Sequence, residues 1–199
     1  MVGTYNFKLI TILILMSFIA VFFTFSIIKR LFISDKKNRI QLFLLSALLV
    51  SVGLWGLHFI ELLAFPLSLI STGYFINYIV FSWLTAYITS FSIIYVSSQK
   101  KLPLSSLLFG SCLAGLGGFG VFYFNVKSLK IATSFTFIPN VSALCILAAI
   151  AVAMLTILVF FWLKSDSGSH RTYTRILFSI IVSLAMIGIQ ITYNNAVFV

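Results

Sequence analysis

The chain has 199 residues, of which 61% are hydrophobic and only 8% are charged. Because soluble domains are about 25% charged, this composition excludes an ordinary soluble protein. It indicates a polytopic membrane protein, for which the expected partner is the lipid bilayer. The net charge of +10 comes from 13 Lys and Arg against 3 Asp and Glu. These charges lie in short gaps between apolar runs, so they indicate membrane topology, and nucleic-acid binding is not expected.

The apolar runs are each close to the roughly 20 residues that a helix needs to cross the hydrocarbon. We predict an all-α, polytopic membrane bundle of six helices that forms one domain over residues 1–199, arranged as three repeated helix pairs. No sequence follows the sixth span, so no soluble output domain is expected. The predicted spans are 8–29, 41–64, 74–96, 103–124, 138–163 and 175–196.

Positive charge is unevenly shared between the two sets of gaps. Ten Lys and Arg follow or flank the first, third and fifth spans, whereas Lys8, Lys127 and Lys130 lie on the other side. The positive-inside rule therefore predicts cytoplasmic gaps after these spans, with the N-terminus and the C-terminus both outside. The first span lacks a basic stretch before it and a small-residue cleavage site after it, so we interpret it as a span and not as a signal peptide.

Segment 52–66 contains the two ionisable side chains that are most unusual for a membrane span, His58 and Glu61. Such groups are energetically expensive in a bilayer and are candidates for function. They are three residues apart, which places them on the same helix face. His58 could be a metal ligand, a titrating switch or a hydrogen-bonded packing residue. Glu61 could extend to the outer interface, or pair with His58 or with Lys127 or Lys130.

Segments 116–123 and 184–191 resemble segment 52–66, and they place Gly56, Gly120 and Gly188 in register at intervals of 64 and 68 residues. Each segment lies in the outer half of an outward-running helix. We therefore expect the three segments to face one another around an outer pocket.

Over nearly its whole length the chain resembles the MHYT-domain family of bacterial integral membrane proteins. The similarity starts at Gly3-Thr4-Tyr5-Asn6 and is strongest over 53–65, G-L-W-G-L-H-F-I-E-L-L-A-F, where the family pattern is close to G-I-W-S-M-H-F-I-G-M-L-A-F. The resemblance implies a six-helix module of the bacterial cytoplasmic membrane. It also implies a copper site of Met and His near the outer face, and sensing of oxygen, carbon monoxide or nitric oxide. Many members carry a cyclic-di-GMP enzyme or a histidine kinase.

The chain departs from the family at the metal-binding positions. Copper favours imidazole and thioether donors, and most of the donors are replaced, so we expect weak copper binding or none, with His58 the one motif ligand kept. Met186 is one turn away from Gln190, and we do not expect it to reach the site. The replacements are Leu57, Glu61, Leu62, Val121, Phe122, Ile189, Gln190 and Ile191, whereas His58, Tyr123 and Thr192 match the pattern.

The predicted outer pocket contains His58, Glu61, Tyr123, Gln190 and Thr192. Gln190 occupies the third His position, and we expect its amide to bond to His58 across the helices.

No catalytic constellation is present, so an enzyme is not expected. We predict a sensor-type module that signals through a separate partner at its cytoplasmic loops. The alternatives are an accessory membrane subunit and a small transporter that uses His58 and Glu61.

Overall fold

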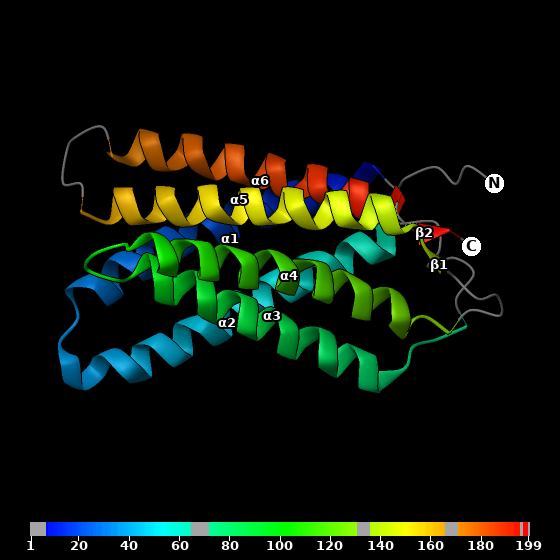
Figure 1. Ribbon diagram of the computed structural model, residues 1–199, viewed down its shortest axis with the longest axis horizontal. Coiled ribbons are helices and arrows are strands. Elements are labelled where there is room, and N and C mark those ends of the chain that lie inside the picture. Colours follow the sequence, from blue (N-terminus) through cyan, green and yellow to red (C-terminus); the bar gives the residue numbers. More distant parts are fainter. Residues whose placement is uncertain (1–6, 65–71, 131–135, 166–170, 196, 199) are drawn as a thin grey trace.

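The computed structural model describes residues 7–64, 72–130, 136–165, 171–195 and 197–198. Within these residues six long α-helices run along one axis and form an elongated bundle (Figure 1). All six contain a stretch long and apolar enough to cross a membrane. The prediction of an all-α membrane bundle is therefore confirmed, and the chain is a multi-pass membrane protein. The helices are α1 (Phe7–Ile33), α2 (Lys36–Ala64), α3 (Ile76–Ser97), α4 (Leu104–Ser128), α5 (Pro139–Ser165) and α6 (Arg171–Asn195).

Each helix packs against its neighbour in sequence, and α6 returns to α1, so the six helices form a closed ring. Additional contacts of α1 and α3 with α5, and of α2 with α4, fill the inside of the ring. Two prolines mark where helices begin. Pro139 is the first residue of α5 and Pro103 directly precedes α4, positions at which the missing N–H costs no intrahelical hydrogen bond.

The short gaps alternate between the two ends of the bundle. The last residues of α1, α3 and α5 lie at the end drawn on the left of Figure 1. We call it the basic end because ten Lys and Arg lie in or beside the gaps that follow these helices in the sequence. The opposite end holds the first residue of α1 and the last residue of α6, and we call it the terminal end. There, β1 (Thr136–Phe137) pairs antiparallel with β2 (Val197–Phe198), a contact that the sequence did not predict.

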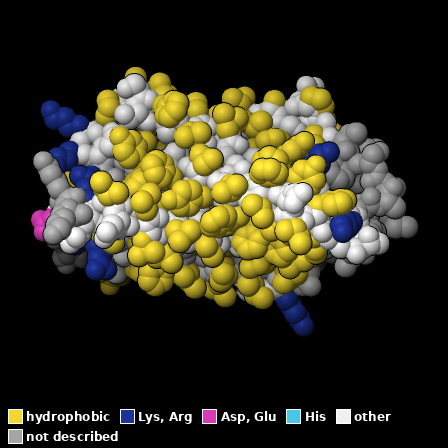
Figure 2. All heavy atoms as spheres, turned by 90° about the horizontal axis from the view of Figure 1, so that it is seen from below, with side chains coloured by type: hydrophobic (Ala, Val, Ile, Leu, Met, Phe, Trp, Pro, Cys, Tyr) yellow, Lys and Arg dark blue, Asp and Glu magenta, His cyan; other side chains and the backbone are white. Residues whose placement is uncertain are grey.

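The outer surface of the bundle is suited to lipid. Figure 2 shows hydrophobic side chains covering the middle of the visible face, with Lys and Arg gathered toward the two ends. Large apolar side chains on several helices are more than half exposed, for example Phe23, Leu49 and Phe109. This arrangement is what a bilayer requires, because the hydrocarbon solvates apolar side chains and charges remain at the interfaces.

The closest helix contacts are made through glycines of α4. A Cβ placed on Gly115 would lie 2.6 Å from the backbone nitrogen of Ile150 in α5. A Cβ on Gly117 would overlap the side chain of Thr89 in α3. Small residues allow membrane helices to approach this closely, so α4 is wedged between α3 and α5. By contrast, a Cβ at Gly56 or Gly188 would have no neighbour within 4 Å, so these two glycines are not needed for close approach.

Two cations hold the end of α3 at the basic end. Lys164 of α5 is buried, and its Nζ donates to the carbonyl oxygens of Ser97 (2.9 Å) and Gln99. Nη2 of Arg39 in α2 donates to the carbonyl oxygen of Ser98 at 3.1 Å. Because the last carbonyls of a helix lack intrahelical partners and carry partial negative charge, these bonds satisfy them and join three helices at one point.

Candidate functional site

His58 and Glu61 lie together on one face of α2. Their exposed fractions are 4% and 6%, and Nδ1 of His58 is 3.4 Å from Oε2 of Glu61. The contact is made between consecutive turns of the same helix, as the spacing of three residues predicts. Among the alternatives for Glu61, the structure therefore shows a buried carboxylate next to His58, and not one that extends to the interface.

The imidazole of His58 faces a cavity of about 90 Å³ in the middle of the bundle. Five helices, α2 to α6, contribute to its wall, which is mostly apolar. The polar residues of the lining are His58, Tyr193, Thr89 and Thr156, and the two threonine hydroxyls donate to carbonyl oxygens of their own helices. The cavity is therefore a small apolar chamber with a few hydrogen-bonding groups, the usual composition of a ligand site.

The three segments that the sequence singled out do meet at this cavity. Segment 52–66 contributes Leu54 and His58, and segment 116–123 contributes Gly118. The third contributes Met186 and Ile189, and Tyr193 follows one turn later on α6. Met186 thus lies at the same cavity as His58, contrary to the expectation that it would not reach the site.

Three of the other predicted pocket residues, Glu61, Tyr123 and Thr192, are not part of the cavity lining. The ring of Tyr123 lies 5.1 Å from that of Phe137, and Nζ of Lys127 is 5.9 Å from the Tyr123 ring centroid. The hydroxyl of Thr192 donates to the carbonyl oxygen of Gly188 in its own helix at 2.8 Å. The side chain of Gln190 lies outside the described residues, so its predicted bond to His58 stays a prediction.

Sequence reasoning missed Tyr193. It is 1% exposed, and its ring packs against Phe119 and Phe122 of α4 at centroid distances of 5.5 and 5.1 Å. Its hydroxyl has no hydrogen-bond partner within the described part of the chain. Such a group costs free energy when it is buried without a partner. The spacing of Met186, Ile189 and Tyr193, three and then four residues apart, is the signal that could have identified this face.

The residues at the cavity do not fit copper well. Two donors that suit copper, the imidazole of His58 and the thioether of Met186, line it. Among the described residues no three His, Cys, Asp or Glu side chains gather where they could hold a metal ion. The positions at which the family has further donors are occupied here by apolar side chains such as Phe122 and Ile189. The described residues therefore bring two donors that suit copper to the cavity, His58 and Met186.

Comparisons with known proteins point to bacterial signalling proteins. The chain is 22% identical over 189 residues to the cyclic di-GMP phosphodiesterase NbdA of Pseudomonas aeruginosa, covering 95% of this chain and 24% of that protein. It is 23% identical over 193 residues to the bifunctional diguanylate cyclase/cyclic di-GMP phosphodiesterase MucR of the same species, covering 96% of this chain and 28% of that protein. No family profile matches, and no solved structure gives a significant match. The chain is thus distantly similar, over nearly its whole length, to about a quarter of two regulators of cyclic di-GMP.

Proposed function

We propose that this chain is a sensor-type module of the bacterial cytoplasmic membrane, of the MHYT type, that detects a small ligand in its central cavity. The observation that carries the proposal is the cavity itself. Three helices bearing the related segments meet there, and the apolar lining includes Tyr193 and His58, which is paired with the buried Glu61. The similarity to two bacterial signalling proteins supports a role in signalling.

The size and lining of the cavity limit the ligand. At about 90 Å³ the cavity is smaller than the engineered cavity of about 150 Å³ that holds benzene. The ligand is therefore a molecule of a few non-hydrogen atoms, mostly apolar, with one group that can hydrogen-bond to Tyr193 or His58. The apolar wall does not favour a transporter, which would need a series of polar groups along a path.

We propose that the module works without copper, because Leu57, Phe122 and Ile189 offer no donor atoms. Purified protein should retain far less than one copper per chain after mild chelation, as measured by elemental analysis. Stoichiometric copper that is lost in both His58→Ala and Met186→Leu, but kept in the control Met154→Leu, would contradict metal independence.

The output, in this proposal, is carried by a separate protein that docks on the basic end. The excess of Lys and Arg at that end supports a cytoplasmic position for it, with both chain termini outside. The module itself is proposed not to be an enzyme. Since both relatives act on cyclic di-GMP by name, the partner is proposed to be an enzyme of cyclic di-GMP synthesis or breakdown.

Filling the cavity tests the function. Gly118 lines the cavity and a Cβ there meets nothing within 4 Å, so Gly118→Leu should place its side chain in the chamber. Gly56→Leu is the matched control, because Gly56 has the same free space and does not line the cavity. In the native host, cellular cyclic di-GMP should change on deletion of the chain, and Gly118→Leu should reproduce the deletion while Gly56→Leu behaves as the wild type. Equal levels in all four strains, with both variants present in the membrane, would contradict the proposal.

A further inference from the structure

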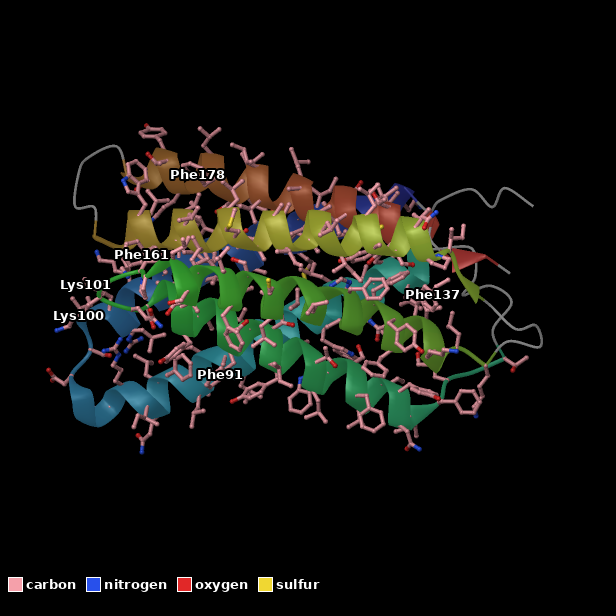
Figure 3. The ribbon with its side chains drawn as sticks, viewed as in Figure 1. Phe91, Lys100, Lys101, Phe137, Phe161 and Phe178 are labelled. Carbon is pink, nitrogen blue, oxygen red and sulfur yellow. The ribbon has the colours of Figure 1, made fainter. Side chains whose placement is uncertain are left out.

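A groove with a cationic end lies between α2 and α3. These two helices cross, and they diverge toward the basic end (Figure 1). A hollow of about 450 Å³ lies between them there. Arg39 and Phe43 of α2 line one side, and Phe91 and Tyr95 of α3 the other, with Lys100 at the end. Figure 3 shows Lys100 at the basic end and Phe91 close to the crossing of the two helices.

Within the described residues, neither cation of this hollow is paired with a carboxylate. Arg39 uses Nη2 to bond the carbonyl oxygen of Ser98, which holds its guanidinium in place. A guanidinium has five N–H donors, so others are available to a ligand. Lys100 is exposed, and no ion pair joins Arg39 or Lys100 to a carboxylate of the described residues. The end of the groove is thus a fixed guanidinium and an ammonium that can together bind a phosphate.

Away from the cations the groove becomes apolar and faces the bilayer. Trp83, Tyr87, Phe91 and Tyr95 are four residues apart and form one stripe along α3, with neighbouring ring centroids 6.2 to 6.5 Å apart. A second hollow of about 440 Å³ lies next to the first, lined by Trp83 and Tyr87 together with leucines of α2 that are exposed, such as Leu44 and Leu48. An acyl chain could lie along this stripe.

We propose that the groove between α2 and α3 is a binding site for one anionic phospholipid, with its phosphate at Arg39 and Lys100 and an acyl chain along the aromatic stripe. The groove offers a surface for each part of a phospholipid. The cations lie at the interface, where the phosphate would be, and the aromatic stripe runs toward mid-membrane, where an acyl chain would be. A lipid with a choline head group would bring a third positive charge beside these two cations. The site therefore favours a lipid with net negative charge.

Native mass spectrometry of the purified, delipidated full chain tests this site. Phosphatidylglycerol should bind as one tight copy, and phosphatidylcholine with the same acyl chains should bind more weakly. Removal of one cation near a phosphate is worth about 1 kcal/mol, so Lys100→Gln should weaken phosphatidylglycerol binding about fivefold. Lys101→Gln is the matched control, because Lys101 is also exposed and does not line the hollow. Glycerol phosphate, which lacks acyl chains, should not compete at the same concentration.

Three results would overturn the proposal. Equal binding of the two lipids would show that the cations do not select charge. Equal weakening by Lys100→Gln and Lys101→Gln would show a diffuse electrostatic attraction and no site. Competition by glycerol phosphate would assign the cations to a soluble phosphate compound and would also contradict a lipid site. Lys100 and Lys101 are both exposed, so each variant should yield folded protein for these measurements.

Discussion

His58 and Glu61 are two ionisable side chains buried in a membrane bundle, where each is energetically expensive. Each is buried, and the two are 3.4 Å apart. Replacing one residue of the pair leaves the other ionisable side chain buried without this contact. Replacing both residues leaves no ionisable side chain of the pair in the bundle. We therefore expect His58→Leu and Glu61→Leu each to lower the free energy of unfolding in detergent. The double variant should lose about 0.5–3 kcal/mol less than the sum of the two.

The control for this double-mutant cycle is Thr192→Val combined with Glu61→Leu. The hydroxyl of Thr192 bonds within its own helix, so these two losses should simply add. Strict additivity in the cycle of His58 with Glu61 would show that their contact contributes nothing to stability.

The hydroxyl of Tyr193 tests whether the cavity contributes a hydrogen-bond partner. It is buried with no partner in the described part of the chain. An unsatisfied buried hydroxyl costs about 1–3 kcal/mol, so Tyr193→Phe should raise the thermal midpoint of ligand-free protein. Tyr123→Phe, which alters a hydroxyl outside the cavity, should change it little. A clear loss of stability in Tyr193→Phe alone would mean that a molecule in the cavity already bonds to the hydroxyl.

At the scale of whole helices, α4 is the element whose position is most tightly specified. Its glycines allow contact with the backbone of α5 and with Thr89 of α3. A Cβ at Gly115 would come 2.6 Å from the Ile150 nitrogen, so Gly115→Ala must push α4 and α5 apart. Overpacking of this kind costs about 1–3 kcal/mol, and the loss should appear as a lower thermal midpoint.

Gly118→Ala is the matched control for that prediction, because it lies on the same helix and its Cβ would enter the open cavity. It should be neutral or slightly stabilising, since Ala is the better helix former. Equal losses in both variants would show that helix propensity, and not the approach of α5, limits position 115.

We infer the orientation of the whole molecule from its charge asymmetry. It can be measured with single cysteines in a chain whose Cys112 and Cys145 are replaced by Ala. A cysteine at Ser34, in the gap after α1, should be protected from an impermeant thiol reagent in intact cells. One at Thr72, which is exposed at the terminal end, should be labelled. The reverse pattern would contradict the positive-inside assignment.

The structure changes the choice of positions for this experiment. Ser128 is the obvious polar site on the outer side in the sequence, but it is fully buried and its hydroxyl donates to the carbonyl oxygen of Asn125. A cysteine there would react poorly whichever side it faced. Ser167, which suits the gap after α5, lies outside the described residues.

The sequence by itself determined the membrane class, the number of helices and their approximate bounds, because hydropathy over about 20 residues is a local property. It also determined that His58 and Glu61 share a face, since residues three apart on a helix are neighbours whatever surrounds them. The departures from the copper pattern were likewise visible from residue types alone, as at Phe122 and Ile189.

Only the tertiary structure decided which residues of α4 and α6 face the centre. Lipid and protein interior favour the same apolar side chains, so hydrophobicity alone does not show how a membrane helix is rotated. Their rotation is set by packing, through the glycines of α4 and the aromatic contacts of Tyr193. That packing turns Tyr123 and Thr192 away from the cavity and brings in Gly118, Met186 and Tyr193. Tertiary packing also brings Arg39 and Lys100 to one groove, because their proximity depends on how α2 and α3 cross.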